Sequence, residues 1–261
     1  MADCNLRCST SEFISSFESP LHAIFWLGGA TFQDYLRRDA ELAATRTGGS
    51  VGEGKGEGKG EGKGEREGEP AYLVFDVETD GGAGRQLAIQ LGYVVFDANH
   101  AELFSRERLL RLPKGRRISW HATKVHRITN NKLHLRGVDP APELQRFFAY
   151  VDQVARASGR VIAHNAAFDA AVVTNTAASC GVPRTLAASN CFCTMRRSTM
   201  PAGLRDRRGA PKPPTNSALY KILHDGQEPS WARLHSAEDD ARITAASYRA
   251  GCARGWWWWK P

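Results

Sequence analysis

The stretch Phe75-Asp76-Val77-Glu78-Thr79 closes the apolar run Tyr72-Leu73-Val74-Phe75. A short apolar run of this kind is typical of a buried strand. Successive side chains of a strand alternate between its faces, so Asp76 and Glu78 are expected to project to the same side. Two neighbouring carboxylates repel each other unless a cation neutralises them, and oxygen ligands suit Mg²⁺ or Mn²⁺ better than zinc. Taken alone, the Asp-x-Glu pattern also fits a solvated strand end.

The composition is that of a globular chain with an excess of basic residues. Of the 261 residues, 42% are hydrophobic, which is enough for a core, and the formal net charge is +7. This charge allows a polyanionic partner, but it fits equally a basic surface that only aids solubility. The six cysteines form no paired Cys-x-x-Cys pattern, which favours reduced thiols and an intracellular setting. No apolar run approaches the ~20 residues of a membrane-spanning helix, so we expect no membrane partner.

The chain divides into four stretches. Residues 1–47 have modest apolar content and a spacing that suits one or two short helices. Residues 48–70 carry a Gly-Glu-Gly-Lys repeat, which predicts a disordered, solvated linker. Residues 71–254 are expected to form the folded domain, and residues 255–261 form a tryptophan-rich tail. The tail fits either exposed rings that stack on bases or bind a partner, or a frayed terminus without function.

The folded stretch predicts strands followed by helices interleaved with strands. After the first strand, two further strands are expected at 86–97 and 102–112, paired antiparallel around a turn at Asn99-His100. A short strand is expected at 161–163, and a proline-rich basic loop at 198–216. Helices are expected at five places, namely 119–134, 140–157, 166–180, 217–224 and 238–253. This order predicts an α/β domain with a mixed sheet.

Two further acidic motifs stand at the starts of predicted helices. His164-Asn165-Ala166-Ala167-Phe168-Asp169 follows a strand directly, where α/β folds place ligand groups, and Asn165 also fits a helix cap. His235-Ser236-Ala237-Glu238-Asp239-Asp240-Ala241 leads into the last helix. Helical geometry puts Asp240 on a small-residue arc that can pack inward and puts Asp239 away from it. We therefore expect Asp240 to be buried and Asp239 to be solvated.

Together the three motifs resemble those of the DEDDh (DnaQ-like) 3′→5′ exonucleases of the RNase H-like superfamily. The matching stretches are FDVET, HNAAFD and HSAEDDA, and the resemblance covers about residues 70–254. AIQLGYVVFD is also similar to the strand that follows the family's first motif, and ISWHATKVHRIT to a segment that ends in His-Gly-Ile-Thr. Arg127 stands where that segment usually has glycine, which puts the local turn in doubt. The resemblance implies an α/β, RNase H-like mixed sheet flanked by helices.

The resemblance also implies the chemistry. Members of the family hydrolyse phosphodiester bonds at nucleic-acid 3′ ends by a two-metal mechanism and release 5′-mononucleotides. Asp76, Glu78, Asp169 and Asp240 would hold two Mg²⁺ or Mn²⁺ ions. His235 would be the general base, with a surface or capping histidine as the alternative. These five are the expected catalytic residues.

Residues that flank the acids are expected to contact the substrate, the 3′ end of a single-stranded nucleic acid. They are Thr79, Asp80, His164, Asn165 and Phe168, although Phe168 also fits a core position. Candidate phosphate contacts lie in three basic clusters, namely Arg196 and Arg197; Arg205, Arg207, Arg208 and Lys212; and Lys114, Arg116 and Arg117.

Other functions remain open from the sequence. Nothing in it identifies a group that reads the 2′-hydroxyl, and DNA is only slightly favoured over RNA. A non-catalytic nucleic-acid-binding module that retains the fold is the alternative, although a degenerate copy would be expected to lack one of the five catalytic residues. A third hypothesis is a recruitment factor that acts through the N-terminal 45 residues and the tryptophan tail.

Overall fold

The computed structural model describes residues 68–81, 85–230, 232 and 235–258. The helices expected within residues 1–47 and the linker up to residue 67 lie outside these described residues, as do the last three residues of the tail.

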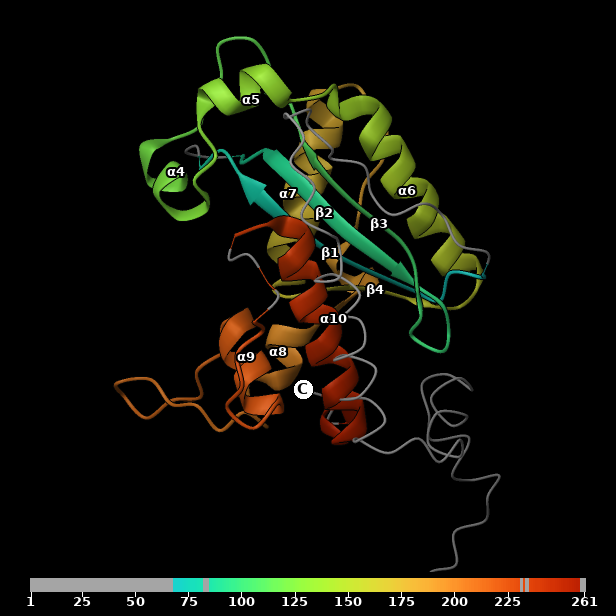
Figure 1. Cartoon of the computed structure of the whole chain (residues 1–261), viewed down its shortest axis with the longest axis vertical. Coiled ribbons are helices and arrows are strands. Elements are labelled where there is room, and N and C mark those ends of the chain that lie inside the picture. The colour runs from blue at the N-terminus through green and yellow to red at the C-terminus, as the bar shows by residue number, and fades with distance from the viewer. Residues whose placement is uncertain (1–67, 82–84, 231, 233–234, 259–261) are drawn as a thin grey trace, which may run out of the picture. The chain divides into compact units, whose positions relative to one another are not determined.

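A five-stranded mixed sheet forms the centre of the domain, with the strand order β3-β2-β1-β4-β5 (Figure 1). β1 pairs antiparallel with β2, and β2 with β3, whereas β1–β4 and β4–β5 are parallel. The bounds are β1 Tyr72–Thr79, β2 Ala88–Phe96, β3 Glu102–Leu109, β4 Arg160–Ala163 and β5 Cys191–Cys193. The predicted mixed sheet and its first antiparallel hairpin are confirmed. The sequence did not predict β5, because three residues are too few to show a period.

Helices were found at all five predicted places. The described α-helices are α4 Trp120–His126, α5 Asn130–Arg136, α6 Pro140–Arg156, α7 Ala166–Ser179, α8 Thr194–Ser198, α9 Asn216–Leu223 and α10 Ala237–Ala253. Short 3₁₀ turns occur at Ala188–Asn190 and Trp256–Trp258. The short helix α8 was not expected.

Local sequence explains where the long helix α6 begins and which face it buries. The carboxylate of Asp139 accepts a hydrogen bond from the N–H of Ala141, and Pro140 occupies the first turn, where its missing N–H is not needed. Leu144 and Phe147 lie on the buried side of the helix, as its 3.6-residue period requires.

The two faces of the sheet pack against different helices. Leu73, Phe75 and Val77 of β1 join a core with residues of α6 and α7. Tyr72 and Val74 face the other way and pack with Ala241, Ala245 and Tyr248 of α10, which crosses that face of the sheet (Figure 1). Because the faces alternate along a strand, Asp76 and Glu78 continue the α10 side. The first motif therefore ends beneath the start of α10.

The end of α4 forms the turn that the sequence left in doubt. Arg127 adopts the left-handed conformation, with φ of 61°, and its N–H donates to the carbonyl oxygen of Thr123 at 2.9 Å. Glycine reaches this conformation without the Cβ penalty, but the turn is formed here with arginine.

In the tail, the rings of Trp256 and Trp257 are packed rather than frayed or free to stack on bases. The indole N–H of Trp257 donates to the carbonyl oxygen of Tyr248 at 2.8 Å, and its ring stacks on the ring of Tyr248. A Cβ at Gly251 would lie 2.0 Å from the Trp257 ring, so glycine allows this close approach. Trp256 packs against Leu219 and its neighbours. These two residues complete the fold beyond residue 254.

Among the described helices, none has both the length and the apolar character needed to cross a bilayer.

Candidate active site

β1 presents two carboxylates side by side on the surface that faces α10. Asp76 and Glu78 are both half-buried, and in the ladder they lie opposite Gly92 and Gln90 of β2. The expectation that these two acids share one side of a strand is confirmed.

The first turn of α10 lies directly on the sheet beside Asp76. A Cβ built on Gly92 would lie 2.2 Å from the carbonyl carbon of Ala237 and 2.2 Å from the backbone nitrogen of Glu238. Only a residue without a side chain permits this approach. Gly92 thus allows the third motif to reach the first.

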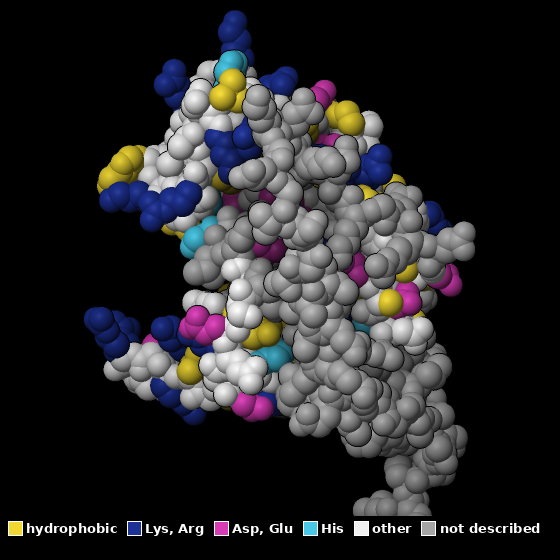
Figure 2. Space-filling model, viewed as in Figure 1, with side chains coloured by type: hydrophobic (Ala, Val, Ile, Leu, Met, Phe, Trp, Pro, Cys, Tyr) yellow, Lys and Arg dark blue, Asp and Glu magenta, His cyan; other side chains and the backbone are white. Residues whose placement is uncertain are grey.

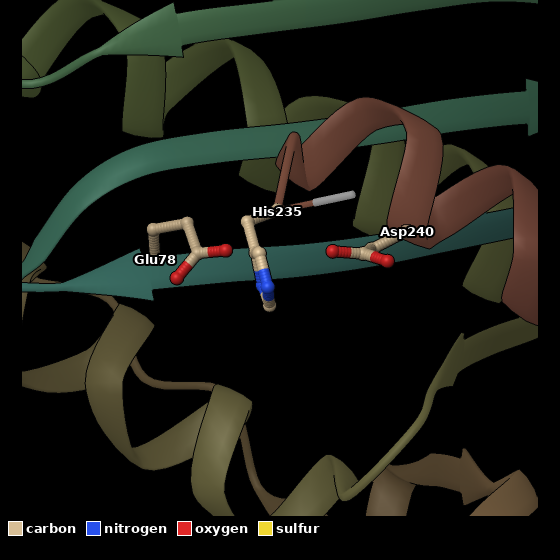
Figure 3. Close-up of side chains that lie close together, drawn as sticks. All are labelled: Glu78, His235 and Asp240. Carbon is tan, nitrogen blue, oxygen red and sulfur yellow. The ribbon is translucent and has the colours of Figure 1, made fainter. Parts of the chain in front are cut away.

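Figure 3 shows the result of this approach, in which Glu78, His235 and Asp240 lie close together. One nitrogen or oxygen atom of each side chain lies within 4.8 Å of the corresponding atoms of the other two. His235 is exposed and has a φ of 63°, so the chain turns sharply just before α10 begins. The imidazole therefore lies at the solvent side of two acids from distant parts of the chain.

Asp169 reaches the same region from the first turn of α7. Its side chain is only 3% exposed, and Oδ2 has no hydrogen-bond partner within the described part of the chain. Asn165 occupies the N-cap position of α7 with a φ of 84°, but its side chain makes no capping hydrogen bond. The interpretation of Asn165 as a side-chain cap is therefore wrong. The chain enters α7 through the left-handed backbone of Asn165, and the side chain bonds to no N–H group of the first turn.

The four acids lie close enough for their charges to interact. Burial raises the pKa of Asp76 well above its usual range, and the negative charges of its three acidic neighbours raise it further. Burial, and then the charge of Glu78, raise the pKa of Asp169 in the same way. Burial followed by repulsion from Asp240 and Glu107 raises the pKa of Glu78 to about 8.

Asp240 follows the same pattern with a smaller shift. Burial and then the nearby Asp239 raise its pKa to about 6, although a hydrogen bond from the backbone N–H of His235 opposes the rise. Such a group of carboxylates is unfavourable unless protons or cations neutralise it. A hard divalent cation such as Mg²⁺ or Mn²⁺ fits this group, because its ligand atoms are oxygens of carboxylates that all carry negative charge when ionised. The unpaired oxygen of Asp169 agrees with such a cation.

The burial expected for the adjacent pair Asp239 and Asp240 needs correction. Asp239 is buried, with 4% of its surface exposed, and Asp240 is half-buried. The helical projection assigned Asp239 to solvent because it treated only the small-residue side of α10 as buried. In the structure a residue outside that side is buried as well. The expectation that Asp240 would lie with Glu78 in one group of acids nevertheless agrees with the geometry.

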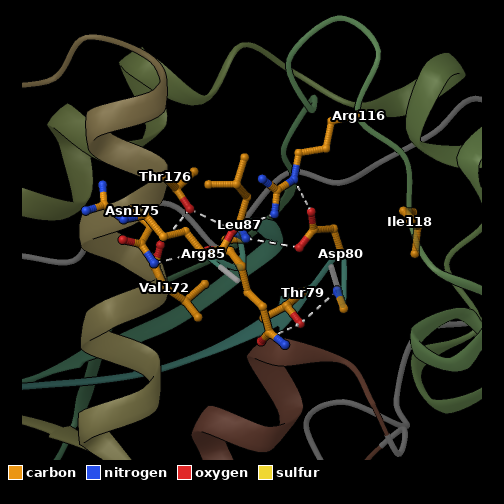
Figure 4. A network of polar contacts seen from close by, with 12 residues as sticks. Thr79, Asp80, Arg85, Leu87, Arg116, Ile118, Val172, Asn175 and Thr176 are labelled. Carbon is orange, nitrogen blue, oxygen red and sulfur yellow. Dashed lines mark hydrogen bonds and ion pairs between the residues drawn. The ribbon is translucent and has the colours of Figure 1, made fainter. Parts of the chain in front are cut away.

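Asp80 supports the loop after β1 and has no surface from which to contact a substrate. Its side chain is fully buried, where it accepts a hydrogen bond from the N–H of Leu87 at 3.1 Å and forms an ion pair with Arg116 (Figure 4). Its carbonyl oxygen accepts from the N–H of Ser119 at 2.8 Å. The expected substrate contact of Asp80 is therefore wrong, and Arg116 is an internal partner rather than a free phosphate contact.

His164 also has a supporting place instead of the expected substrate contact. It is buried, and its Nε2–H donates to the carbonyl oxygen of Pro214 at 3.1 Å. Nδ1 then accepts from the hydroxyl of Thr194 at 3.0 Å, which leaves neither ring nitrogen for a substrate. Burial lowers the pKa of His164 to about 4, so the ring is neutral. His164 thus joins the second motif to Thr194 of α8 and to Pro214, which lies just before α9.

Thr79, Asn165 and Phe168 are the expected substrate contacts that stay predictions. Thr79 and Asn165 are half-buried, and Phe168 is 40% exposed one residue before Asp169. The exposure of Phe168 agrees better with a surface contact than with the core position that the sequence also allowed.

Sequence reasoning missed the residues that hold this site from behind. His126 donates from Nε2 to the carbonyl oxygen of Thr79 at 3.2 Å and accepts at Nδ1 from the N–H of Ile128. Glu107 of β3 accepts hydrogen bonds from the start of α10. His126 stands in a stretch that was recognised as similar to the family, so a signal was present. No local pattern marks Glu107.

Comparisons with known proteins agree with this fold. An exonuclease family profile, RNase_T, matches residues 73–248. No curated protein matches the chain.

Solved exonuclease structures share the fold at low sequence identity. Cell-death related nuclease 4 (CRN-4) superposes with a TM-score of 0.56 at 14% identity, covering 71% of this chain and 64% of that one. Exonuclease I of E. coli, in complex with a dT13 oligonucleotide, gives 0.53 at 17% identity, over 70% of this chain and 41% of that one. Exonuclease I of Methylocaldum szegediense gives 0.51 at 18% identity, over 70% and 40%. The match thus spans less than two thirds of each of these chains, and it confirms the RNase H-like α/β fold.

Proposed function

The chain belongs to the RNase_T exonuclease family, and from this premise we propose that it is a DEDDh-type, metal-dependent 3′→5′ exonuclease. It would hydrolyse the terminal phosphodiester bond of a nucleic-acid strand and release 5′-mononucleotides. The observation that carries the proposal is the convergence of Asp76, Glu78, Asp169 and Asp240 beside His235. A module that had lost catalysis would have no reason to retain this electrostatically unfavourable group.

Each residue has a role that follows from its place. Asp76, Glu78, Asp169 and Asp240 are the residues that would hold two Mg²⁺ or Mn²⁺ ions. When bound, the cations would stabilise negative charge at the phosphate and lower the pKa of the attacking water. His235 would accept a proton from that water as the general base, and its exposed position beside Glu78 and Asp240 supports this role.

A hollow in the molecular surface offers a path for the strand. In Figure 2 the hollow opens between the end of the domain that carries α4 and a projecting loop, and Lys and Arg side chains lie on both rims. We call residues 204–212 of this loop the basic hairpin. The backbone N–H of Lys212 donates to the carbonyl oxygen of Leu204 at 2.9 Å and closes the hairpin. At the tip, the carboxylate of Asp206 accepts hydrogen bonds from the backbone N–H groups of Arg208 and Ala210.

The basic hairpin is suited to phosphate contacts. Arg205, Arg207, Arg208 and Lys212 are all exposed, and none of them takes part in an ion pair within the described residues. The segment that returns from the hairpin passes Pro214, whose carbonyl oxygen binds His164 of the second motif. We therefore propose that a single strand enters along the hairpin and delivers its 3′ end to the acids. Single-stranded DNA is the first substrate to test, because the E. coli exonuclease I structure holds a dT13 oligonucleotide.

Digestion of 5′-labelled oligonucleotides tests the activity. The wild-type protein with Mg²⁺ or Mn²⁺ should shorten a single strand from its 3′ end in steps of one nucleotide. Asp169→Asn should be inactive, whereas Asp152→Asn, which alters an acid paired with Arg184 on the surface, should retain activity. A panel of single- and double-stranded DNA and RNA gives the sugar preference. Undiminished digestion in excess EDTA would end the proposal.

A further inference from the structure

The start of α10 is capped by residues of the sheet rather than by its own N-cap residue. Ser236 occupies the N-cap position, where a serine side chain usually accepts a hydrogen bond from an N–H of the first turn. Here Ser236 makes no such bond, and its hydroxyl instead donates to Oε2 of Glu107 at 2.5 Å. The same oxygen accepts the N–H of Glu238 at 3.2 Å. Glu107, on β3, thus performs the capping that Ser236 usually would.

A second strand supplies the other acceptor. The N–H of Ala237 donates to Oε1 of Gln90 on β2 at 3.3 Å. The first intrahelical bond runs from the N–H of Asp240 to the carbonyl oxygen of Ser236 at 2.8 Å. Two N–H groups that a helix start would otherwise leave unpaired are therefore bound by side chains of the sheet.

These contacts fix the third motif against the first. Asp76 of β1 lies opposite Gly92 of β2, and Gly92 lies opposite Glu107 of β3. One row across the sheet therefore contains Asp76, Gly92, on which the start of α10 packs, and Glu107. His235 immediately precedes the capped turn, and Asp240 lies within it. A shift of this turn would move both side chains relative to Asp76 and Glu78.

A separate contact anchors the body of α10. Arg242 forms an ion pair with Glu102 at 2.7 Å and donates to the hydroxyl of Ser105 at 3.0 Å. Ala241, Ala245 and Tyr248 also hold the helix through the core. Loss of Glu107 would leave these contacts in place, so the first turn would be displaced while the helix stays docked.

We propose that Glu107 is a positioning residue, which uses its two hydrogen bonds to the start of α10 to hold His235 and Asp240 in register with Asp76 and Glu78. Its effect on the rate of hydrolysis rests on the proposed function, but its effect on the geometry does not. A displacement of about 1 Å at a catalytic site can lower the rate by up to about 100-fold. Glu107 would therefore matter for turnover more than for substrate affinity.

Three variants separate this role from general stabilisation. Glu107→Ala removes the oxygen that accepts both hydrogen bonds, whereas Glu107→Gln retains an oxygen that can accept the same two hydrogen bonds without the charge. Glu102→Gln is the matched control, because it weakens another contact between β3 and α10, at Arg242, and leaves the two hydrogen bonds of Glu107 to the helix start intact. For each variant we would measure amide hydrogen exchange at Ala237 and Glu238, the rise in Tm on addition of Mn²⁺, and kcat and KM on a 5′-labelled oligonucleotide.

Glu107→Ala should exchange faster at both amides, show a smaller Mn²⁺-induced rise in Tm and lose about 10- to 100-fold in kcat with little change in KM. Glu107→Gln and Glu102→Gln should stay close to wild type in all three. Normal exchange and a normal Mn²⁺ response in Glu107→Ala would overturn the proposal. Equal damage in Glu107→Gln would also overturn it, since charge rather than capping would then be responsible. If the wild-type protein degrades no nucleic acid, the proposed function fails, while exchange and the Mn²⁺ response still decide the role of Glu107.

Discussion

The acid cluster and the basic hairpin differ in how they are built. The acids come from β1, α7 and α10, and burial raises the pKa of each of them. Their positions depend on contacts between residues far apart in the chain, such as Glu107 with Ser236 and Glu238. The hairpin is local, because its described backbone bonds join residues within 204–212 and its basic side chains are exposed.

This difference teaches which property each region can control. A buried group of like charges is expensive to assemble and has a fixed geometry, which suits the stabilisation of one transition state. Exposed charges on a hairpin bind phosphates through long-range attraction that salt screens, which suits affinity without sequence readout. We therefore expect changes in the cluster to alter turnover and changes in the hairpin to alter binding.

The largest effect is expected from Asp76→Asn. Removing this central charge should lower kcat by about 10³-fold, because the group that stabilises the transition state would be incomplete. Binding of a 5′-labelled single strand in the presence of Ca²⁺, measured by fluorescence anisotropy, should change little. A variant that loses binding in proportion to its activity would contradict the division between the two regions.

The raised pKa values of the cluster predict an unusual pH dependence of stability. The pKa of Glu78 rises from 4.5 to about 8 on folding, so the native state holds a proton that the unfolded chain releases. Stability should therefore be greatest below about pH 4.5 as far as this group is concerned, and it should fall as the pH rises towards 8. In EDTA, the Tm should be lower at pH 8 than at pH 5.5 by about 5 °C or more.

Two variants give the control for this measurement. Glu78→Gln should flatten the dependence of Tm on pH, and the double variant Arg207→Ser/Arg208→Ser should leave it unchanged. A wild-type Tm that rises between pH 5.5 and 8 in EDTA would show that the buried acids do not dominate.

Neutralising the hairpin should weaken binding and spare the chemistry. For Arg207→Ser/Arg208→Ser we expect KM on a long single strand to rise about 10-fold, with a salt dependence shallower by about 0.7 per lost phosphate contact. Turnover of the p-nitrophenyl ester of thymidine 5′-phosphate, which is too small to reach both regions, should be unchanged.

Removing two positive charges at another place on the surface provides the control. Arg146→Ser/Arg156→Ser alters α6, which packs on the sheet face opposite α10, and it should leave KM at the wild-type value. Equal losses in the two double variants would show that net charge, rather than the hairpin, determines affinity.

The smallest effect is expected at Arg127, in the turn after α4. Its φ of 61° costs an L-residue about 1–2 kcal/mol, but glycine also gains freedom in the unfolded chain, so Arg127→Gly should stabilise the protein by only about 0.5–1 kcal/mol. Arg127→Ala removes the same charge without relieving the strain, and it should bring no gain. Urea unfolding of both variants measures the difference, and a gain in Arg127→Ala would attribute the effect to charge instead.

The mixed sheet and most helices followed from local pattern, whereas several details of the site did not. Alternation along β1 placed Asp76 and Glu78 on one face, and the recognised motifs pointed to Asp169, His235 and Asp240. Asp80 is next to these acids in sequence, yet it binds Leu87 and Arg116 inside the protein. Adjacency in a motif cannot distinguish a side chain that faces the substrate from one that supports the loop behind it.

The sequence by itself determined the family, the order of the elements and the five residues proposed for catalysis, because strand alternation and short motifs are local properties. Only the tertiary structure showed that Asp239 is buried, that both ring nitrogens of His164 are bound within the protein, and that Glu107 caps α10. These features depend on contacts between residues that are far apart in the sequence. The hydrophobic pattern of one segment does not show which residue of another segment will contact it after folding.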